Sequence, residues 1–154
     1  MNWEVVSAVA EAVGAIAVVA SLIYLALQIR QNNAAVRAST YEAGLSHATN
    51  LTGLLLSNEA LGQAWIRGLN APGELDATDL LRFNGFMLRF FRMLESFHHQ
   101  AASGLLDSEL WEVSWRESLE YARKPGAIAW WRDNRQFFTV SFREFADREI
   151  EANV

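Results

Sequence analysis

The stretch VGAIAVVASLIYLALQI, residues 13–29, contains no charged side chain. As an α-helix it is about 26 Å long, close to the ~30 Å hydrocarbon core of a bilayer. A few residues on its N-terminal side complete the span, so we expect the span to start near Val9 or Ala12. Glu11 then lies close to the lipid headgroups. The stretch predicts one transmembrane helix near the N-terminus, and the rest of the chain must be organised around it.

An apolar segment near the N-terminus can also be a secretory signal or the core helix of a soluble protein. A secretory signal has basic residues before its apolar run and a small-residue cleavage site after it. Here Glu4 and Glu11 precede the run without any Lys or Arg, and QIRQNN, residues 28–33, follows it. A core helix of a soluble protein keeps a polar stripe for water, and this segment has none of useful width. We therefore favour a retained anchor over both alternatives.

Basic residues near the apolar segment predict its orientation. None precedes the segment, whereas Arg30 and Arg37 follow it closely. Cytoplasmic flanks of membrane helices are enriched in Lys and Arg, so the short N-terminus should lie outside. We expect a transmembrane anchor over residues 1–30 and a cytoplasmic helical domain over residues 31–154.

One side of the predicted anchor carries only small or polar residues, at alternating spacings of three and four positions. The members of this small-residue seam are Ser7, Ala10, Gly14, Ala17, Ser21, Tyr24 and Gln28. Small residues let membrane helices approach closely, and the spacing is that of a left-handed helix pair. The seam predicts a helix–helix interface. The alternative is that a segment so rich in Ala, Gly and Ser shows this pattern by chance.

The remaining sequence predicts an all-α domain. Apolar residues recur at helical spacing, and no alternating strand pattern occurs. Because no clear breaker lies between Gln28 and Gly44, the anchor helix can continue into this domain as one helix. A very apolar helix over about residues 76–103, ended by Gly104, should be the centre of a bundle of four to five helices. Helix starts are indicated at Ser57, Asp76, Asp107, Pro125 and the Ser141–Glu144 pair.

Composition narrows the possible functions. The chain has 154 residues, 51% hydrophobic and 20% charged, which fits a folded chain rather than a disordered one. Its net charge of −5 argues against a general nucleic-acid partner, which must neutralise phosphates with Lys and Arg. The absence of cysteine removes disulfides, thiolate metal sites and cysteine nucleophiles. No glycine-rich phosphate loop or nucleophile motif occurs, so we expect neither a cofactor nor an enzyme.

Three groups of residues are candidates for chemistry or binding. Glu95 and His98, followed by His99, match the Glu-x-x-His pair of di-iron bundles, but those bundles need a second copy. A stripe of Arg82, Arg89 and Arg92 on the central helix could contact an anion or a lipid headgroup, or could be a solvated, ion-paired face. Five of the six tryptophans, Trp65, Trp111, Trp115, Trp130 and Trp131, could line a pocket or a partner groove, although most should belong to the core. Trp130 or Trp131 is the better candidate for exposure, because two neighbours cannot face the same way.

Two segments resemble a family of uncharacterised single-pass bacterial membrane proteins. They are GAIAVVASLIYLALQIRQNNAAVRAST, residues 14–40, and KPGAIAWWRDNRQFFTVSFREF, residues 124–145, with its Pro-Gly, paired Trp and Phe-Arg elements. The resemblance extends over nearly the whole chain. It implies a bacterial cytoplasmic (inner) membrane, one anchor and a helical domain, and it implies no activity.

Three functions remain as hypotheses. The first is a membrane-anchored helical interaction or structural subunit, self-associating or accessory to a larger membrane complex. The second is a homo-oligomeric pore with Glu11 near its mouth, where a ring of carboxylates attracts cations. The third is a metal-dependent enzyme that uses Glu95 and His98, for which the sequence offers the least support.

Overall fold

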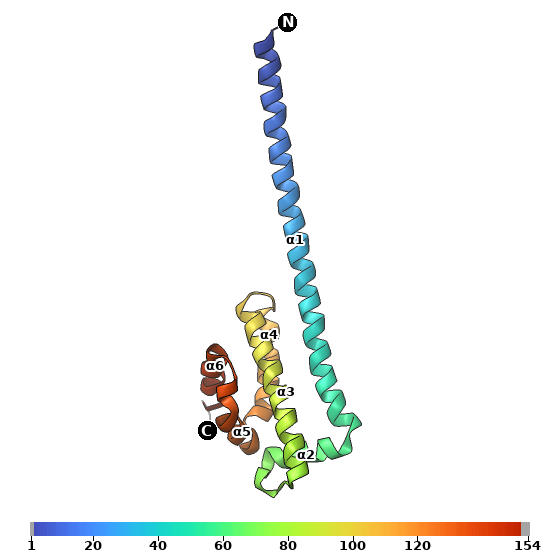
Figure 1. The fold of residues 1–154 in the computed structure, drawn as a ribbon, viewed down its shortest axis with the longest axis vertical. Coiled ribbons are helices and arrows are strands. Elements are labelled where there is room, and N and C mark those ends of the chain that lie inside the picture. Colours follow the sequence, from blue (N-terminus) through green and yellow to red (C-terminus); the bar gives the residue numbers. More distant parts are fainter. Residues whose placement is uncertain (1, 152–154) are drawn as a thin grey trace. The chain divides into compact units, whose positions relative to one another are not determined.

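The computed structural model describes residues 2–151, including all of their side chains except those of Val5 and Glu151. All regular secondary structure in this part of the chain is helical and it contains no strand, which confirms the predicted all-α class. The elements are α1 (Trp3–Ser57), α2 (Glu59–Asn70), η1 (Pro72–Glu74), α3 (Ala77–Ala102), α4 (Ser108–Ala122), α5 (Pro125–Asn134), η2 (Arg135–Phe137) and α6 (Val140–Glu151), where η marks a 3₁₀ helix (Figure 1).

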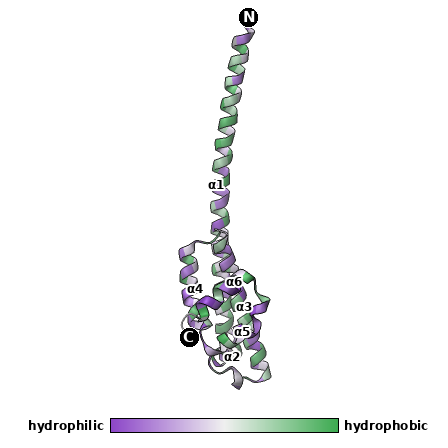
Figure 2. Ribbon diagram, turned by 90° about the vertical axis from the view of Figure 1, so that its left-hand side faces the viewer, coloured by the Kyte–Doolittle hydropathy of each residue, from purple (hydrophilic) through white to green (hydrophobic). Residues whose placement is uncertain are grey.

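The chain divides into two compact units, Met1–Ser39 and Thr40–Val154. Helix α1 contributes to both, because it runs without interruption from Trp3 to Ser57. The apolar helix thus continues past Gln28, as the lack of a breaker allowed. Within the described residues, α1 is the one helix long and apolar enough to cross a membrane. Figure 2 shows apolar residues, in green, recurring along the first unit.

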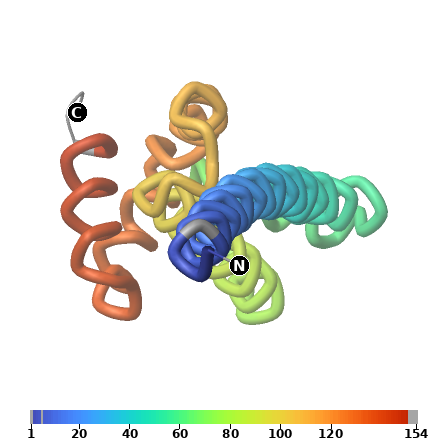
Figure 3. The backbone as a smooth tube through the Cα atoms, turned by 90° about the horizontal axis from the view of Figure 1, so that it is seen from above, coloured from blue at the N-terminus to red at the C-terminus, as the bar shows by residue number. Residues whose placement is uncertain are grey.

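Helix α3 is the centre of the second unit. It packs against α2, α4, α5 and α6, and its buried face supplies the aromatic core. The Phe91 ring stacks on Trp130 and Trp131 of α5, with ring centroids 5.5 and 4.7 Å away. Figure 3 shows α6, in red, along one side of the bundle, where Phe142 completes the core. The core residues are Leu51, Trp65, Leu69, Phe83, Phe86, Met87, Phe90, Phe91, Leu94, Phe97, Trp111, Trp115, Ala122, Ala127, Trp130, Trp131, Phe138, Phe142, Ala146 and Ile150.

Both tryptophans of the Trp-Trp pair are buried, so the expectation that one of them is exposed was wrong. Trp130 is 6% exposed and Trp131 is 2% exposed. Both rings stack on Phe91 of α3 and contact Phe138, and Trp131 also meets Phe142 of α6, so neighbouring positions on α5 are covered together. The Trp131 indole also finds a polar partner, because its N–H donates to Asp147 Oδ1 at 2.8 Å.

Two glycines let helix backbones touch inside the bundle. A Cβ at Gly126, in the first turn of α5, would lie 1.8 Å from the carbonyl oxygen of Gly68 in α2. A Cβ at Gly68 would in turn lie 2.3 Å from the Phe83 ring of α3. The Pro125-Gly126 pair therefore starts α5 where its backbone lies directly against the backbone of α2.

Most helix starts follow the sequence signals. The side chains of Asp76 and Asp107 accept hydrogen bonds from backbone N–H groups in the first turns of α3 and α4. Pro125 occupies the first turn of α5, where its missing N–H costs nothing. Gly104 follows the C-cap of α3 with a φ of 69°, which glycine adopts without strain.

Two predicted helix starts were wrong. Ser57 is the last residue of α1, and Asn58 caps α2 by accepting the Leu61 N–H at 3.0 Å. Asparagine is as good a cap as serine, so the side chains alone did not separate the two positions. Helix α6 begins at Val140, which places Ser141 inside its first turn.

Candidate functional site

The small-residue seam lies on the exposed surface of the first unit. All described side chains from Asn2 to Ser39 are exposed, and a Cβ at Gly14 would meet nothing within 4 Å. Ser21 donates its hydroxyl hydrogen to the Ala17 carbonyl at 2.8 Å, so its polar group is satisfied within the helix. From Ser7 to Ser21 the seam is a strip of small side chains, and all of its side chains are exposed within residues 2–151.

Glu95 stabilises the bundle through its hydrogen bonds. Its carboxylate accepts the Thr139 N–H at 2.7 Å and pairs with Arg92 at 2.6 Å. Burial raises the pKa of Glu95, but these bonds to Thr139 and Arg92 outweigh it and hold the pKa below its usual value. Glu95 of α3 thereby caps the start of α6, a role that sequence spacing does not reveal because the two elements are far apart in the chain.

His98, three residues further along α3, is packed among aromatic rings. Its ring centroid lies 4.9 Å from Phe145, 5.7 Å from Phe142 and 5.9 Å from Trp111. Burial lowers its pKa, helped by neighbouring His99 and opposed by Glu95. Within residues 2–151, no group of three or more His, Cys, Asp or Glu side chains is placed to hold a metal ion.

The three arginines of α3 have different surroundings. Arg82 pairs with Asp79 at 2.8 Å, and Arg67 of α2 pairs with the same carboxylate from the other side. Hydrogen bonding to Arg82 outweighs the effect of burial and, together with the charge of Arg67, holds the pKa of Asp79 below its usual value. Asp79 thus joins α2 to α3 through its two arginine partners.

Arg89 and Arg92 lie together beside a hollow of about 460 Å³ between α3 and the last part of α1. Arg92 also donates to the Phe137 carbonyl at 2.9 Å and lies over the Phe138 ring, 4.7 Å from its centroid. Arg89 has no ion pair within the described residues. His47 and Asn50 of α1 line the same hollow. Arg89 is therefore the cation of the stripe that remains available to an anion.

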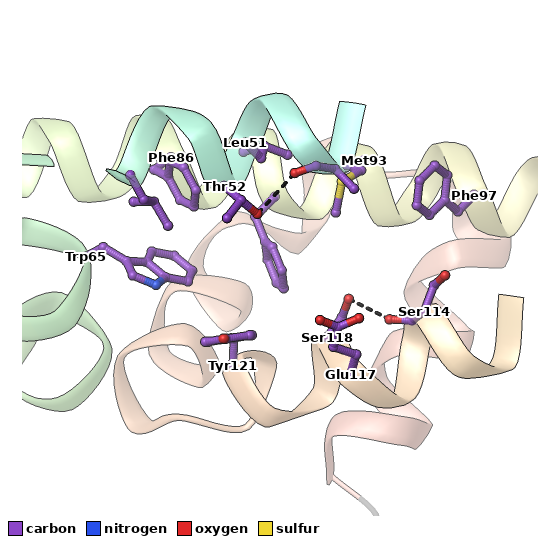
Figure 4. A pocket seen from close by; sticks show the side chains of 13 residues that line it. Leu51, Thr52, Trp65, Phe86, Met93, Phe97, Ser114, Glu117, Ser118 and Tyr121 are labelled. Atoms are coloured by element: carbon purple, nitrogen blue, oxygen red, sulfur yellow. Dashed lines mark hydrogen bonds between the residues drawn. The ribbon is translucent and has the colours of Figure 1, made fainter. Parts of the chain in front are cut away.

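A second, more enclosed cavity of about 290 Å³ lies on another side of the same α1 segment, within the second unit (Figure 4). Aromatic and aliphatic side chains of α1, α2 and α3 form its walls, and Figure 4 shows Trp65 and Phe86 at one end and Phe97 at the other. The Trp65 ring contacts Phe86 at 4.7 Å and Tyr121 at 6.1 Å between centroids. The wall residues are Ala48, Leu51, Leu55, Trp65, Phe86, Phe90, Met93 and Phe97.

The polar edge of this aromatic cavity comes mainly from α4. Ser114, Glu117, Ser118 and Tyr121 lie along one side of that helix, and Thr52 faces the cavity from α1. The Ser118 hydroxyl donates to the Ser114 carbonyl at 2.8 Å, so its oxygen is left to accept a hydrogen bond. Glu117 is the one formally charged residue of the lining. The sequence offered Trp65 as a possible pocket residue but did not indicate the rest of this lining, because its residues come from four helices.

Comparisons of the chain with protein-family models, with curated proteins and with solved structures give no significant match.

Proposed function

We propose that the protein is a membrane-anchored helical subunit that self-associates through its anchor. The observation that carries the proposal is the exposure of the apolar helix. Eleven Val, Leu and Ile side chains between Val6 and Ile29 are each at least half exposed. Moving them from water into lipid is worth on the order of 10 kcal/mol, since each such side chain contributes about 1.5–3 kcal/mol when fully buried. A bilayer is the environment that supplies this burial along the whole segment.

We propose that the protein is located in the inner membrane of a bacterium, with its N-terminus outside and its second unit in the cytoplasm. Arg30 and Arg37 support this orientation through the positive-inside preference. The likeness of residues 14–40 to bacterial single-pass proteins supports the compartment.

The small-residue seam supports self-association. Lipid provides no hydrophobic drive between helices, so membrane helices associate where backbones come close enough for dense packing. Gly14 has open space around its Cα and lies between Ala10 and Ala17 on the seam. A second copy, or a helix of a larger membrane complex, fits against this strip.

Two experiments test the proposal in sequence. First, we expect the full-length protein to sediment with membranes in high-speed centrifugation and to need detergent for release. Recovery in the soluble fraction without detergent contradicts the anchor. Second, we expect Gly14→Leu to reduce self-association of residues 1–33 in a bilayer two-hybrid or cross-linking assay. Ile16→Leu, on the opposite face, should leave self-association unchanged. Equal association of the wild type and Gly14→Leu contradicts the seam but not the anchor.

A further inference from the structure

We propose that the aromatic cavity beneath the last part of α1 binds a small organic cation, an amine with an aromatic or short alkyl body. The cavity has the general properties of a ligand site. Its volume of about 290 Å³ is at the lower end of the range for small-molecule pockets, which are mostly apolar with a few polar groups. A ligand of about ten to fifteen non-hydrogen atoms fits this space.

The walls of the cavity favour a ligand with an apolar or aromatic part. Trp65, Phe86 and Phe90 are each no more than 7% exposed, yet all three line the cavity. Their ring faces carry negative electrostatic potential, which attracts a cation placed over them. A positively charged head on an apolar body therefore gains from both properties of the same wall.

The polar edge of the cavity favours a ligand whose polar group is positively charged. Glu117 supplies the only formal charge, and it is negative. The hydroxyl hydrogens of Thr52 and Ser118 are already donated to the carbonyls of Ala48 and Ser114, at 3.2 and 2.8 Å. Their oxygens therefore face the cavity as acceptors, and an ammonium group, with only donors, matches such an edge. A carboxylate head is repelled by Glu117, and a neutral head gains no ion pair.

The two hollows beside α1 thus differ in charge. Arg89 and Arg92 line one of them, and Glu117 lines the other. Met93, Leu51 and Phe97 line both hollows and form the partition between them. A cationic ligand is therefore directed to the aromatic cavity by the charges on either side of this partition.

Three probes of one shape test the charge preference: 4-phenylbutylamine, 4-phenylbutanol and 4-phenylbutyrate. Full-length protein in nanodiscs of zwitterionic phosphatidylcholine is titrated with each probe by isothermal calorimetry, and empty nanodiscs give the contribution of lipid partitioning. We expect the amine, protonated at pH 7, to bind about tenfold more tightly than the alcohol. The carboxylate should bind more weakly than the alcohol.

Three variants identify the site. Glu117→Gln should bring amine affinity to within about threefold of alcohol affinity while leaving alcohol binding unchanged. The matched control Glu120→Gln, on an exposed position of α4 outside the lining, should behave as the wild type. Ala48→Phe fills the cavity and should abolish saturable binding of both the amine and the alcohol.

The inference is overturned by any of three results. One is the absence of saturable amine binding to the wild type beyond that of empty nanodiscs. Another is an amine preference that persists unchanged in Glu117→Gln. The third is full amine binding by Ala48→Phe in protein that retains a cooperative unfolding transition. Glu117 is exposed, so we expect Glu117→Gln to fold. The Glu117→Gln result therefore still tests the inference if Ala48→Phe fails to fold.

Discussion

The contact between Gly126 and Gly68 makes the strongest prediction for stability. Gly126→Ala adds a Cβ 1.8 Å from the Gly68 carbonyl oxygen and 3.1 Å from the Leu69 Cα. These neighbours are backbone atoms, so no side-chain rotation relieves the overlap. The two helices must part by at least about 1 Å in a densely packed interior. We expect a loss of about 3 kcal/mol in the free energy of unfolding, as for overpacked cores.

Gly85→Ala is the matched control. Gly85 lies in the middle of α3 on an exposed position, and a Cβ there meets nothing within 4 Å. Alanine in a helix interior is about 0.5–1 kcal/mol more favourable than glycine, so this variant should be slightly more stable than the wild type. The same substitution thus has opposite effects at the two sites.

Thermal unfolding of the full-length protein in mild detergent, followed by near-ultraviolet circular dichroism, measures both effects. The buried rings of Trp130 and Trp131 report on the packing near α5. For a unit of this size, 3 kcal/mol corresponds to a decrease of roughly 10 °C in the melting temperature of Gly126→Ala. A melting temperature within about 2 °C of the wild type for Gly126→Ala refutes the direct backbone contact between α2 and α5.

Three further predictions concern ionisable groups. Asp79→Asn should lower the melting temperature at pH 7, and its effect should shrink as the pH falls below about 4. The contribution of a carboxylate with a lowered pKa is complete above its unfolded pKa and is lost as the pH falls through its folded pKa. His98→Phe should reduce the loss of stability between pH 7.5 and 5.5, since the lowered pKa makes the unfolded state bind more protons below about pH 6.5. Glu95→Ala should cost about 1–2 kcal/mol in urea unfolding, because the Thr139 N–H loses its acceptor. Unchanged transitions in these variants contradict the corresponding contacts.

The sequence predicted those parts of the fold that depend on local signals. The apolar helix near the N-terminus, the centrality of α3 and the caps at Asp76 and Asp107 follow from hydropathy, periodicity and the side chain next to each helix start. The predicted start of α6 was wrong because the helix begins where Glu95 of α3 accepts the Thr139 N–H, and Glu95 is 44 residues away in the sequence. Local patterns carry no information on such a partner.

The candidate sites were harder to predict for the same reason. The sequence shows a stripe of three arginines. Arg82 pairs with Asp79, Arg92 pairs with Glu95, and Arg89 has no ion pair within the described residues, and these pairings depend on which helices lie alongside. Of the aromatic cavity, the sequence indicated only Trp65, as one of five tryptophans that could line a pocket. Its lining residues are spread from Ala48 to Tyr121, and each resembles an ordinary core or surface position in its local sequence.

The cavity exists because one turn of α1 carries small side chains opposite large rings. Ala48 and Thr52 are four residues apart and so lie on one face of the helix, while Leu51 is buried and anchors the same segment. Leucine at Ala48, which is half-buried, would fill part of the space and contribute about 1–2 kcal/mol through burial of apolar surface. The chain forgoes this packing and also keeps the Glu117 carboxylate at the rim. Retaining an open, charged and aromatic cavity at the expense of stability is the pattern of a binding site, because a ligand supplies the missing contacts only when it is present.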